Sequence, residues 1–327
     1  MPDLSTDDTA KVPAVAGSMA VATTPGGGPE PGVEREFTIK ARTQRELIMR
    51  RFLQHRGAVI SLVIFLVLVL SAFVLGHFWH YRYDQFTDEL SSPPTGKHPF
   101  GTDSDGKDLL AEVLRGTQRS MEIAMFVAII ATAVGTAYGA ISGYYGGRVD
   151  NIMMRIVDLF LTLPAIAVAA VLGHNFGDSK ILSGWLVIAI ILSVLGWAGV
   201  ARVVRGVMLS LREKEFVEAA QALGATDRRI IFRHLLPNAL GPIIVNVTIA
   251  VAVAILAETA LSFVGFGVKA PDTSLGLLIS QNQTAASTRP WLFYFPGLFI
   301  IVIALTVNFI GDGLRDAFDP TQTRVRA

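Results

Sequence analysis

The chain has 327 residues, of which 51% are hydrophobic and only 17% are charged, and its mean hydropathy is +0.49. This composition is too apolar for an ordinary soluble domain and predicts a membrane protein. The formal net charge of +1 gives no indication of an acidic partner such as a nucleic acid. The absence of cysteine from the sequence excludes disulfides, thiolate metal sites and cysteine nucleophiles.

The two ends of the chain are polar. Residues 1–39 are rich in proline, glycine, alanine, threonine and aspartate, and such a segment buries too little apolar surface to offset the entropy of ordering it. We expect a disordered tail there, followed by a basic pre-membrane segment at 40–57 and a transmembrane domain at 58–318. Residues 319–327 are expected to form a second tail.

Six apolar stretches are long enough to cross a bilayer as helices, at about residues 58–78, 123–143, 156–172, 184–204, 242–264 and 291–310. They predict an all-α integral membrane protein with six transmembrane helices. Pro164 interrupts the third stretch and is expected to kink its helix. Before the second stretch, Asp105 is expected to cap a separate short helix that lies on the membrane surface and carries Leu109.

Small residues recur every four positions in the second stretch, at Ala131, Gly135, Gly139 and Gly143. At helical spacing they leave one side of the helix almost bare of side chains, so that a neighbouring helix can approach closely. We therefore predict that this side is a packing face.

The positive charges give the orientation. With the N-terminus inside, eighteen lysines and arginines near the membrane lie on the inner side and eight on the outer side. The positive-inside rule then puts both tails and the long polar loop at 205–241 on the cytoplasmic side of the membrane. The chain is thus expected to be a multi-pass protein of the cytoplasmic membrane.

That loop has the pattern of two short helices joined by a corner. Apolar residues at helical spacing predict the first helix, with one face made by Phe216, Ala219, Ala220 and Leu223. Gly224 follows where a helix C-terminus favours φ > 0, and Thr226 or Asp227 can cap the next helix. This second helix, with Ile231 and Phe232, is expected to end at Pro237, which lacks a backbone donor.

A helix pair of this kind has several uses. A DNA-binding helix-turn-helix shares its small residue and glycine turn, but it needs a supporting helical core, which a loop between two membrane spans does not offer. An amphipathic hairpin resting on the lipid surface would suit the basic face of the second helix. A third use is as a coupling element that receives movement from another subunit.

Acidic residues in or near the spans are candidates for function, because a charge at that depth is costly unless it is paired or faces water. Glu122 and Glu258 are the candidates for a gate or cavity, and the alternative is that each reaches the membrane interface. Asp158 is expected to form an ion pair with Arg155, three residues earlier. We predict no metal site, since Asp103 and its acidic neighbours suit turn and cap roles better than a calcium loop.

The sequence contains no GxxxxGK[ST] phosphate-binding loop and no nucleophile motif. The chain is therefore predicted not to be an enzyme and to bind no cofactor. If ATP drives its function, another subunit must hydrolyse it.

The segment EAAQALGATDRRIIFRHLLPN, at 218–238, resembles the EAA loop of ABC importer permeases. His234 stands where that family has isoleucine. The segments HPFGTDSDGKDLL, GYYGGRVDNIMMRIVDLFLTLP and ILAETALSFVGFGVKAP resemble the C-type permease subunit of dipeptide and oligopeptide importers, and the resemblance covers about residues 40–318. Leu275 stands where that subunit commonly has tryptophan.

The resemblance implies the type I importer architecture, with a cytoplasmic coupling helix between spans four and five. It implies a heterodimer of homologous permeases, two cytoplasmic ATPase subunits that bind ATP and Mg, an extracytoplasmic solute-binding protein and a peptide substrate. It implies an ATPase-coupling role for Phe216, Glu218, Ala219, Ala220, Gly224, Arg228 and Pro237. An importer of nickel chelate, glutathione or another small solute is the nearest alternative, and an ATP-independent secondary transporter is an alternative of a different class.

Overall fold

A computed structural model describes residues 44–177 and 182–318. The two expected tails, 1–39 and 319–327, lie outside the described residues. Within the described ranges every regular element is a helix, and the loop at 79–108 adds two isolated β-bridges. The all-α prediction is thus confirmed for this part of the chain.

The helices follow one another along the chain with short connections, apart from the loop at 79–108. In order they are α1 (Gln44–Gln54), α2 (Arg56–Leu70), a π-helical turn (Ser71–Leu75), α3 (Gly76–Phe78), α4 (Leu109–Tyr145), α5 (Gly147–Thr162), α6 (Ala165–Phe176), α7 (Gly184–Arg212), α8 (Glu215–Ala222), α9 (Asp227–Arg229), a second π-helical turn (Ile230–Leu235), α10 (Leu236–Phe263), α11 (Leu275–Asn282), a 3₁₀ turn (Gln283–Ser287) and α12 (Trp291–Phe318).

Five helical segments in the described ranges are long and apolar enough to cross a membrane, namely Arg56–Phe78, Leu109–Tyr145, Gly184–Arg212, Asp227–Phe263 and Trp291–Phe318. The helices α5 and α6 together form a sixth candidate that is bent by 78°. Five of the six predicted apolar stretches lie within these segments, and the stretch 242–264 ends one residue beyond Phe263.

The bend between α5 and α6 is sharper than the expected kink. Pro164 occupies the N-cap position of α6, and Leu163 before it is extended, with ψ of 136°. A proline disfavours the α conformation in the residue that precedes it, because its ring clashes with that residue's backbone. The third span is therefore two separate helices rather than one kinked helix.

The expected surface helix near Leu109 does not exist as a separate element. Helix α4 runs without interruption from Leu109 to Tyr145, and the capping residue is Asp108, whose Oδ1 accepts a hydrogen bond from the N–H of Ala111 at 2.8 Å. Asp105 instead lies in the turn before it. No proline breaks the segment, and its arginines find carboxylate partners, so the helix continues into the span.

The predicted packing face of α4 is confirmed, and its partner is α7. A Cβ added at Gly135 would lie 2.7 Å from the carbonyl oxygen of Trp197, and one added at Gly143 would lie 2.6 Å from the Cβ of Met208. Such distances show that the two backbones touch where the side chains are missing. Helices α4 and α7 thus form a tightly packed pair.

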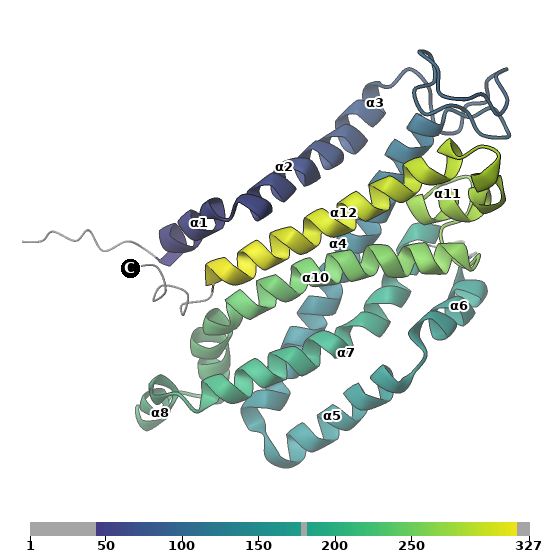
Figure 1. Cartoon of the computed structure of the whole chain (residues 1–327). Coiled ribbons are helices and arrows are strands. Elements are labelled where there is room, and N and C mark those ends of the chain that lie inside the picture. The colour runs from purple at the N-terminus through teal and green to yellow at the C-terminus, as the bar shows by residue number, and fades with distance from the viewer. Residues whose placement is uncertain (1–43, 178–181, 319–327) are drawn as a thin grey trace, which may run out of the picture. The chain divides into compact units, whose positions relative to one another are not determined.

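The remaining spans pack around this pair. Helix α10 packs on α4 and α12, α12 packs on α2, and α11 lies against α4, α10 and α12. In Figure 1, α8 and the corner between α4 and α5 lie at one end of the spans, while α11 and the loop at 79–108 lie at the other. We call these the α8 end and the α11 end.

Candidate functional site

Helix α8 divides its apolar residues between two sides. Val217 and Ala220 are buried in a cluster that includes Val204, Met208 and Leu235. Phe216 is 38% exposed and Leu223 is 88% exposed, while Glu218 and Ala219 are also exposed. The predicted grouping of Ala220 with Phe216 and Leu223 is therefore wrong, because Ala220 turns inward with Val217 and leaves the other side of α8 uncovered.

The predicted glycine corner is present. Gly224 has a φ of +76°, and the N–H of Ala225 donates to the carbonyl of Ala220 at 3.0 Å. Together with the bond from Gly224 to the carbonyl of Gln221, this pattern closes the end of α8. A Cβ at position 224 would meet nothing within 4 Å, so the need for glycine is conformational and not steric crowding by neighbours.

The second helix of this loop differs from the prediction at both ends. Thr226 occupies the N-cap position of α9 without a side-chain capping bond. At the other end the helix continues into α10, of which Pro237 is the second residue, and the π-helical turn Ile230–Leu235 ends two residues before the proline. A π-helical turn changes the backbone hydrogen-bond pattern next to a residue that cannot donate, which explains why Pro237 does not end the helix.

Several side chains of the loop are uncovered, and one of them, Phe232, also lines an apolar groove against α4. We define the α8 surface as the exposed residues Phe216, Glu218, Ala219, Leu223, Arg228 and Phe232, of which Phe232 is 64% exposed. Of the predicted coupling residues, Ala220 is buried beneath this surface and Gly224 and Pro237 shape the backbone that carries it. An apolar surface with charges beside it is suited to contact with another protein.

Polar contacts hold the loop and the neighbouring helix ends in place. The hydroxyl of Tyr144, at the end of α4, donates to Oδ1 of Asp227 at 2.7 Å. Arg212, at the end of α7, donates to the carbonyls of Gly143 and Tyr144 at 3.4 and 3.3 Å. The α8 surface is thus mounted on the ends of the α4 and α7 pair.

Two ion pairs connect α5 to α7. Arg205 binds both carboxylate oxygens of Asp150, with each N–O distance 2.5 Å, and Ser142 of α4 donates to the same carboxylate. Asp158 pairs with Arg202 at 2.6 Å, so the predicted pair with Arg155 is wrong. The bidentate geometry of Arg205 and Asp150 fixes the direction of α5 as well as its distance from α7.

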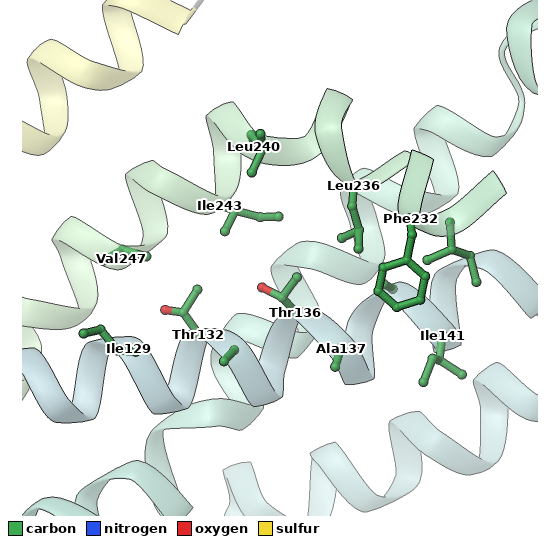
Figure 2. Close-up of a pocket in the computed structure, with 13 residues that line it drawn as sticks. Ile129, Thr132, Thr136, Ala137, Ile141, Phe232, Leu236, Leu240, Ile243 and Val247 are labelled. Atoms are coloured by element: carbon green, nitrogen blue, oxygen red, sulfur yellow. The ribbon is translucent and has the colours of Figure 1, made fainter. Parts of the chain in front are cut away.

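An apolar groove of about 560 Å³ runs between α4 on one side and the π-helical turn Ile230–Leu235 with α10 on the other. Figure 2 shows Thr132 and Thr136 on α4 facing Ile243 and Leu236 across it. The hydroxyls of both threonines are buried and have no hydrogen-bond partner among the described residues. Glu258 and Glu122 do not line this groove.

Glu258 lies in the packed interior near the α11 end. Its side chain is 0% exposed and accepts hydrogen bonds from the hydroxyls of Ser274, Ser262 and Ser120, at 2.7, 2.7 and 3.1 Å. These serines come from the start of α11, from α10 and from α4. The carboxyl group therefore joins three elements and is enclosed by them.

Glu122 has a different environment, since its carboxylate is part of an ion-pair cluster at the edge of α4. Arg119 binds Glu122 at 2.5 Å and Asp272 at 2.5 Å, and Arg115 binds Asp272 at 3.0 Å. Asp272 belongs to the segment between α10 and α11, so this cluster ties that segment to α4. Sequence reasoning missed these arginines because their partner is more than 150 residues away.

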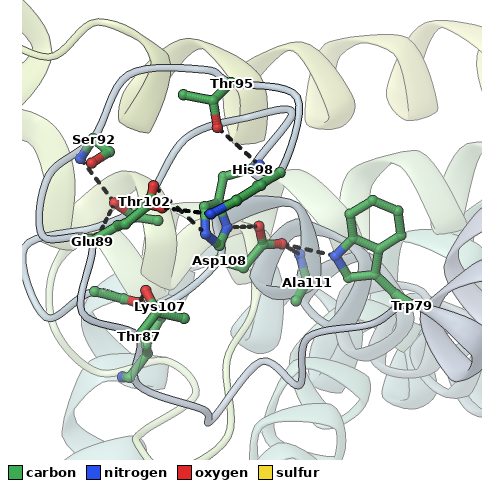
Figure 3. A network of polar contacts seen from close by, with 12 residues as sticks. Trp79, Thr87, Glu89, Ser92, Thr95, His98, Thr102, Lys107, Asp108 and Ala111 are labelled. Atoms are coloured by element: carbon green, nitrogen blue, oxygen red, sulfur yellow. Dashed lines mark hydrogen bonds and ion pairs between the residues drawn. The ribbon is translucent and has the colours of Figure 1, made fainter.

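The loop at 79–108 is organised by one buried histidine that sequence reasoning also missed. His98 is 1% exposed, and its Nδ1 lies 2.7 Å from Oδ2 of Asp108, whose Oδ1 accepts a hydrogen bond from Trp79 (Figure 3). Thr102, near the centre of the same network, donates to the carbonyl of Glu89. His98 and Asp108 both lie in the segment HPFGTDSDGKDLL. Their closeness in the sequence was the signal that could have predicted this contact.

The acidic residues of this loop have the predicted turn and cap roles. Oδ1 of Asp103 accepts hydrogen bonds from the backbone N–H groups of Asp105 and Lys107, and Asp108 caps α4. Burial raises the pKa of the Asp103 carboxyl above its usual value, although the two N–H groups act in the opposite direction. Among the described residues no group of three or more potential metal ligands occurs.

The fold is that of a multi-pass helical membrane protein. The solved structures with this fold include inward-facing conformations of the MetNI methionine ABC transporter. One of them gives a TM-score of 0.55 at 18% sequence identity and covers 63% of this chain and 96% of that chain.

The family is shown by sequence. Residues 135–324 match the family described as binding-protein-dependent transport system inner membrane component, and residues 43–94 match the N-terminal TM domain of oligopeptide transport permease C. The chain belongs to the family of binding-protein-dependent transport system inner membrane components.

Curated relatives cover nearly the whole length. The oligopeptide transport system permease protein OppC of Mycobacterium tuberculosis (strain ATCC 25618 / H37Rv) is 43% identical, over 87% of this chain and 97% of the relative. The OppC proteins of Escherichia coli (strain K12) and Bacillus subtilis (strain 168) are 39% and 38% identical, over 87% and 83% of this chain and 94% and 88% of those proteins.

Proposed function

We propose that this chain is a permease subunit of an ATP-driven ABC importer that moves dipeptides or short oligopeptides across the cytoplasmic membrane. The observation that carries the proposal is the α8 surface, an uncovered apolar helix face mounted on the ends of two packed spans. The relatives named as oligopeptide permeases support the choice of substrate. The chain itself is not an enzyme in this proposal, and partner ATPases bind ATP and Mg.

The α8 surface is where we place the contact with an ATPase. Leu223 and Phe216 offer apolar area, and Glu218 and Arg228 offer charges for recognition at its edge. The corner at Gly224 fixes the angle between α8 and the helix that continues into α10. In this arrangement the α8 end faces the cytoplasm, as do the chain termini, and movement of the ATPases drives alternating access of the spans.

Two further partners belong to the proposal. A homologous second permease would pack along the groove between α4 and α10, because an open apolar groove with two unpartnered hydroxyls is the kind of surface that a neighbouring transmembrane helix covers. An extracytoplasmic solute-binding protein would deliver peptide at the α11 end. The bilayer covers the remaining apolar faces of the spans.

The test combines purification with transport. A tagged chain expressed together with the permease, ATPase and binding protein encoded beside it is expected to recover the ATPase, and the reconstituted complex to take up a labelled tripeptide only with ATP. Uptake of nickel chelate or glutathione in place of the tripeptide would favour the alternative importers. Uptake by the chain alone without ATP would show a secondary transporter, and failure to recover any ATPase would overturn the proposal.

A further inference from the structure

Helix α4 makes polar contacts near both of its ends. One end contacts the loop that carries the α8 surface, and the other contacts the segment between α10 and α11. It spans 37 residues, which at 1.5 Å per residue is about 55 Å of helix. The segment Asp227–Phe263 has the same length but contains a π-helical turn, and the span before α4 contains another. An uninterrupted helix transmits displacement along its axis, whereas a π-helical turn is a place where a helix can change its hydrogen bonding.

At the α8 end, Tyr144 makes a polar contact between α4 and the loop that carries the α8 surface. Its hydroxyl donates to Asp227, the first residue of α9, at 2.7 Å. The hydroxyl therefore contacts the helix that follows the Gly224 corner. If α8, Gly224 and α9 moved together, the hydroxyl of Tyr144 would be displaced with them.

The end of α4 is also held firmly by its neighbour. Arg212 of α7 donates to the carbonyls of Gly143 and Tyr144, and Gly143 lies against Met208. Because the two helices have no side chains between them at the glycine positions, α4 and α7 cannot slide past one another without collision. A displacement at Tyr144 is thus passed to the whole pair and not absorbed at the helix end.

At the α11 end, α4 holds the segment between α10 and α11. Arg115 and Arg119 bind Asp272, and the hydroxyl of Ser120 accepts a hydrogen bond from the N–H of Leu275 while it donates to Glu258. Every one of these contacts starts on α4 and crosses to a segment more than 130 residues away.

We propose that Tyr144 is the positioning residue that ties the coupling loop to α4, so that α4 carries movement of the α8 surface to the segment around Asp272 at the opposite end. The inference rests on the proposed function for the source of the movement. It assigns Tyr144, Asp227 and Asp272 to the coupling between ATP hydrolysis and opening of the α11 end. Removal of the Tyr144 hydroxyl would break the hydrogen bond between loop and helix and leave their apolar packing in place.

The test uses Tyr144→Phe, which removes only the hydroxyl, with Tyr145→Phe as the matched control. The hydroxyl of Tyr145 makes no hydrogen bond to the described residues, although the two tyrosine rings are adjacent. Because the sequence has no cysteine, single-cysteine reporters can be introduced without removing native ones. Cysteine at Ala225 reports on the corner, and cysteine at the buried Thr273 reports on the α11 end.

The first measurement uses the purified full chain and needs no partner. Tyr144→Phe is expected to increase alkylation of the cysteine at position 225 about fivefold, since a loop that has lost a tie opens locally more often. Tyr145→Phe is expected to leave the rate unchanged. Equal rates in the two variants would overturn the inference, whether or not the chain transports anything.

The second measurement uses the reconstituted complex with its ATPases and binding protein. Tyr144→Phe is expected to retain ATP hydrolysis and melting temperature while the amount of tripeptide taken up per ATP falls about fivefold, the lower end of typical couplings between sites. ATP should also no longer change the alkylation of the cysteine at position 273. Wild-type uptake per ATP in Tyr144→Phe would refute the role of Tyr144, whereas a wild-type complex without ATP-driven uptake would refute the proposed function.

Discussion

The two ends of this protein are stabilised in different ways. At the α11 end, buried or half-buried acidic side chains find partners within the chain, as Glu258 does with three serines and Asp272 with two arginines. At the α8 end, the loop rests on an apolar cluster and a few single hydrogen bonds, while Leu223 and Phe232 remain uncovered. The difference is that packing within this chain encloses the acidic groups at the α11 end, whereas Leu223 and Phe232 at the α8 end stay uncovered.

The largest expected effect is that of Glu258→Ala, which leaves three buried serine hydroxyls without their acceptor. Unsatisfied buried polar groups each cost about 1–3 kcal/mol, so three of them predict a loss of stability of at least about 3 kcal/mol. The measurement is the melting temperature of the detergent-solubilised protein. Glu122→Ala is the control, since Glu122 is partly exposed and its single pair should contribute less than about 1 kcal/mol. Equal melting temperatures for the two variants would contradict the role of Glu258 as a junction.

Asp272→Asn comes next, because it removes the charge that two arginines of α4 share. Hydrogen bonds to charged groups contribute about 1.5–3 kcal/mol, and partial exposure places this cluster at the lower end. We expect alkylation of a cysteine at Thr273 to rise about tenfold, which corresponds to about 1.4 kcal/mol of easier local opening. A cysteine at Ala285, after α11, is the control and should react at its original rate.

Gly224→Val tests the corner at the α8 end. A β-branched residue at a φ of +76° costs about 1–2 kcal/mol, although the site has room for its side chain. We expect a small fall in melting temperature and a larger fall in uptake per ATP, because the angle between α8 and α9 changes. Gly224→Asn should be milder, since asparagine tolerates this conformation better. If valine supports normal uptake in reconstituted vesicles, the corner is not needed for coupling.

Leu223→Ser should have the smallest effect on the chain itself. Its side chain is 88% exposed, so the melting temperature should change by less than the equivalent of about 0.5 kcal/mol. The expected loss is instead in recovery of the ATPase during purification. Leu90→Ser, at an exposed leucine in the loop at the α11 end, is the control and should recover the ATPase normally. A loss of recovery in both variants would remove the distinction between the two ends.

Local sequence patterns were sufficient for several features of the fold. The six apolar stretches, the packing face of α4 and the glycine corner depend on residues close together in the chain, and the structure has all three. The same local logic failed where a distant partner intervened. Leu109 was expected in a separate surface helix capped by Asp105, but it begins α4, whose Arg115 and Arg119 pair with the distant Asp272.

The sequence by itself determined that this chain is a helical membrane protein with a helix pair exposed between two spans, because apolar periodicity and turn residues act over a few positions. Only the tertiary structure decided which side of α8 remains uncovered, that Asp158 pairs with Arg202, and that Glu258 joins α4, α10 and α11. Those outcomes depend on which helices become neighbours, and a buried charge selects its partner from whatever the packing brings within hydrogen-bonding distance.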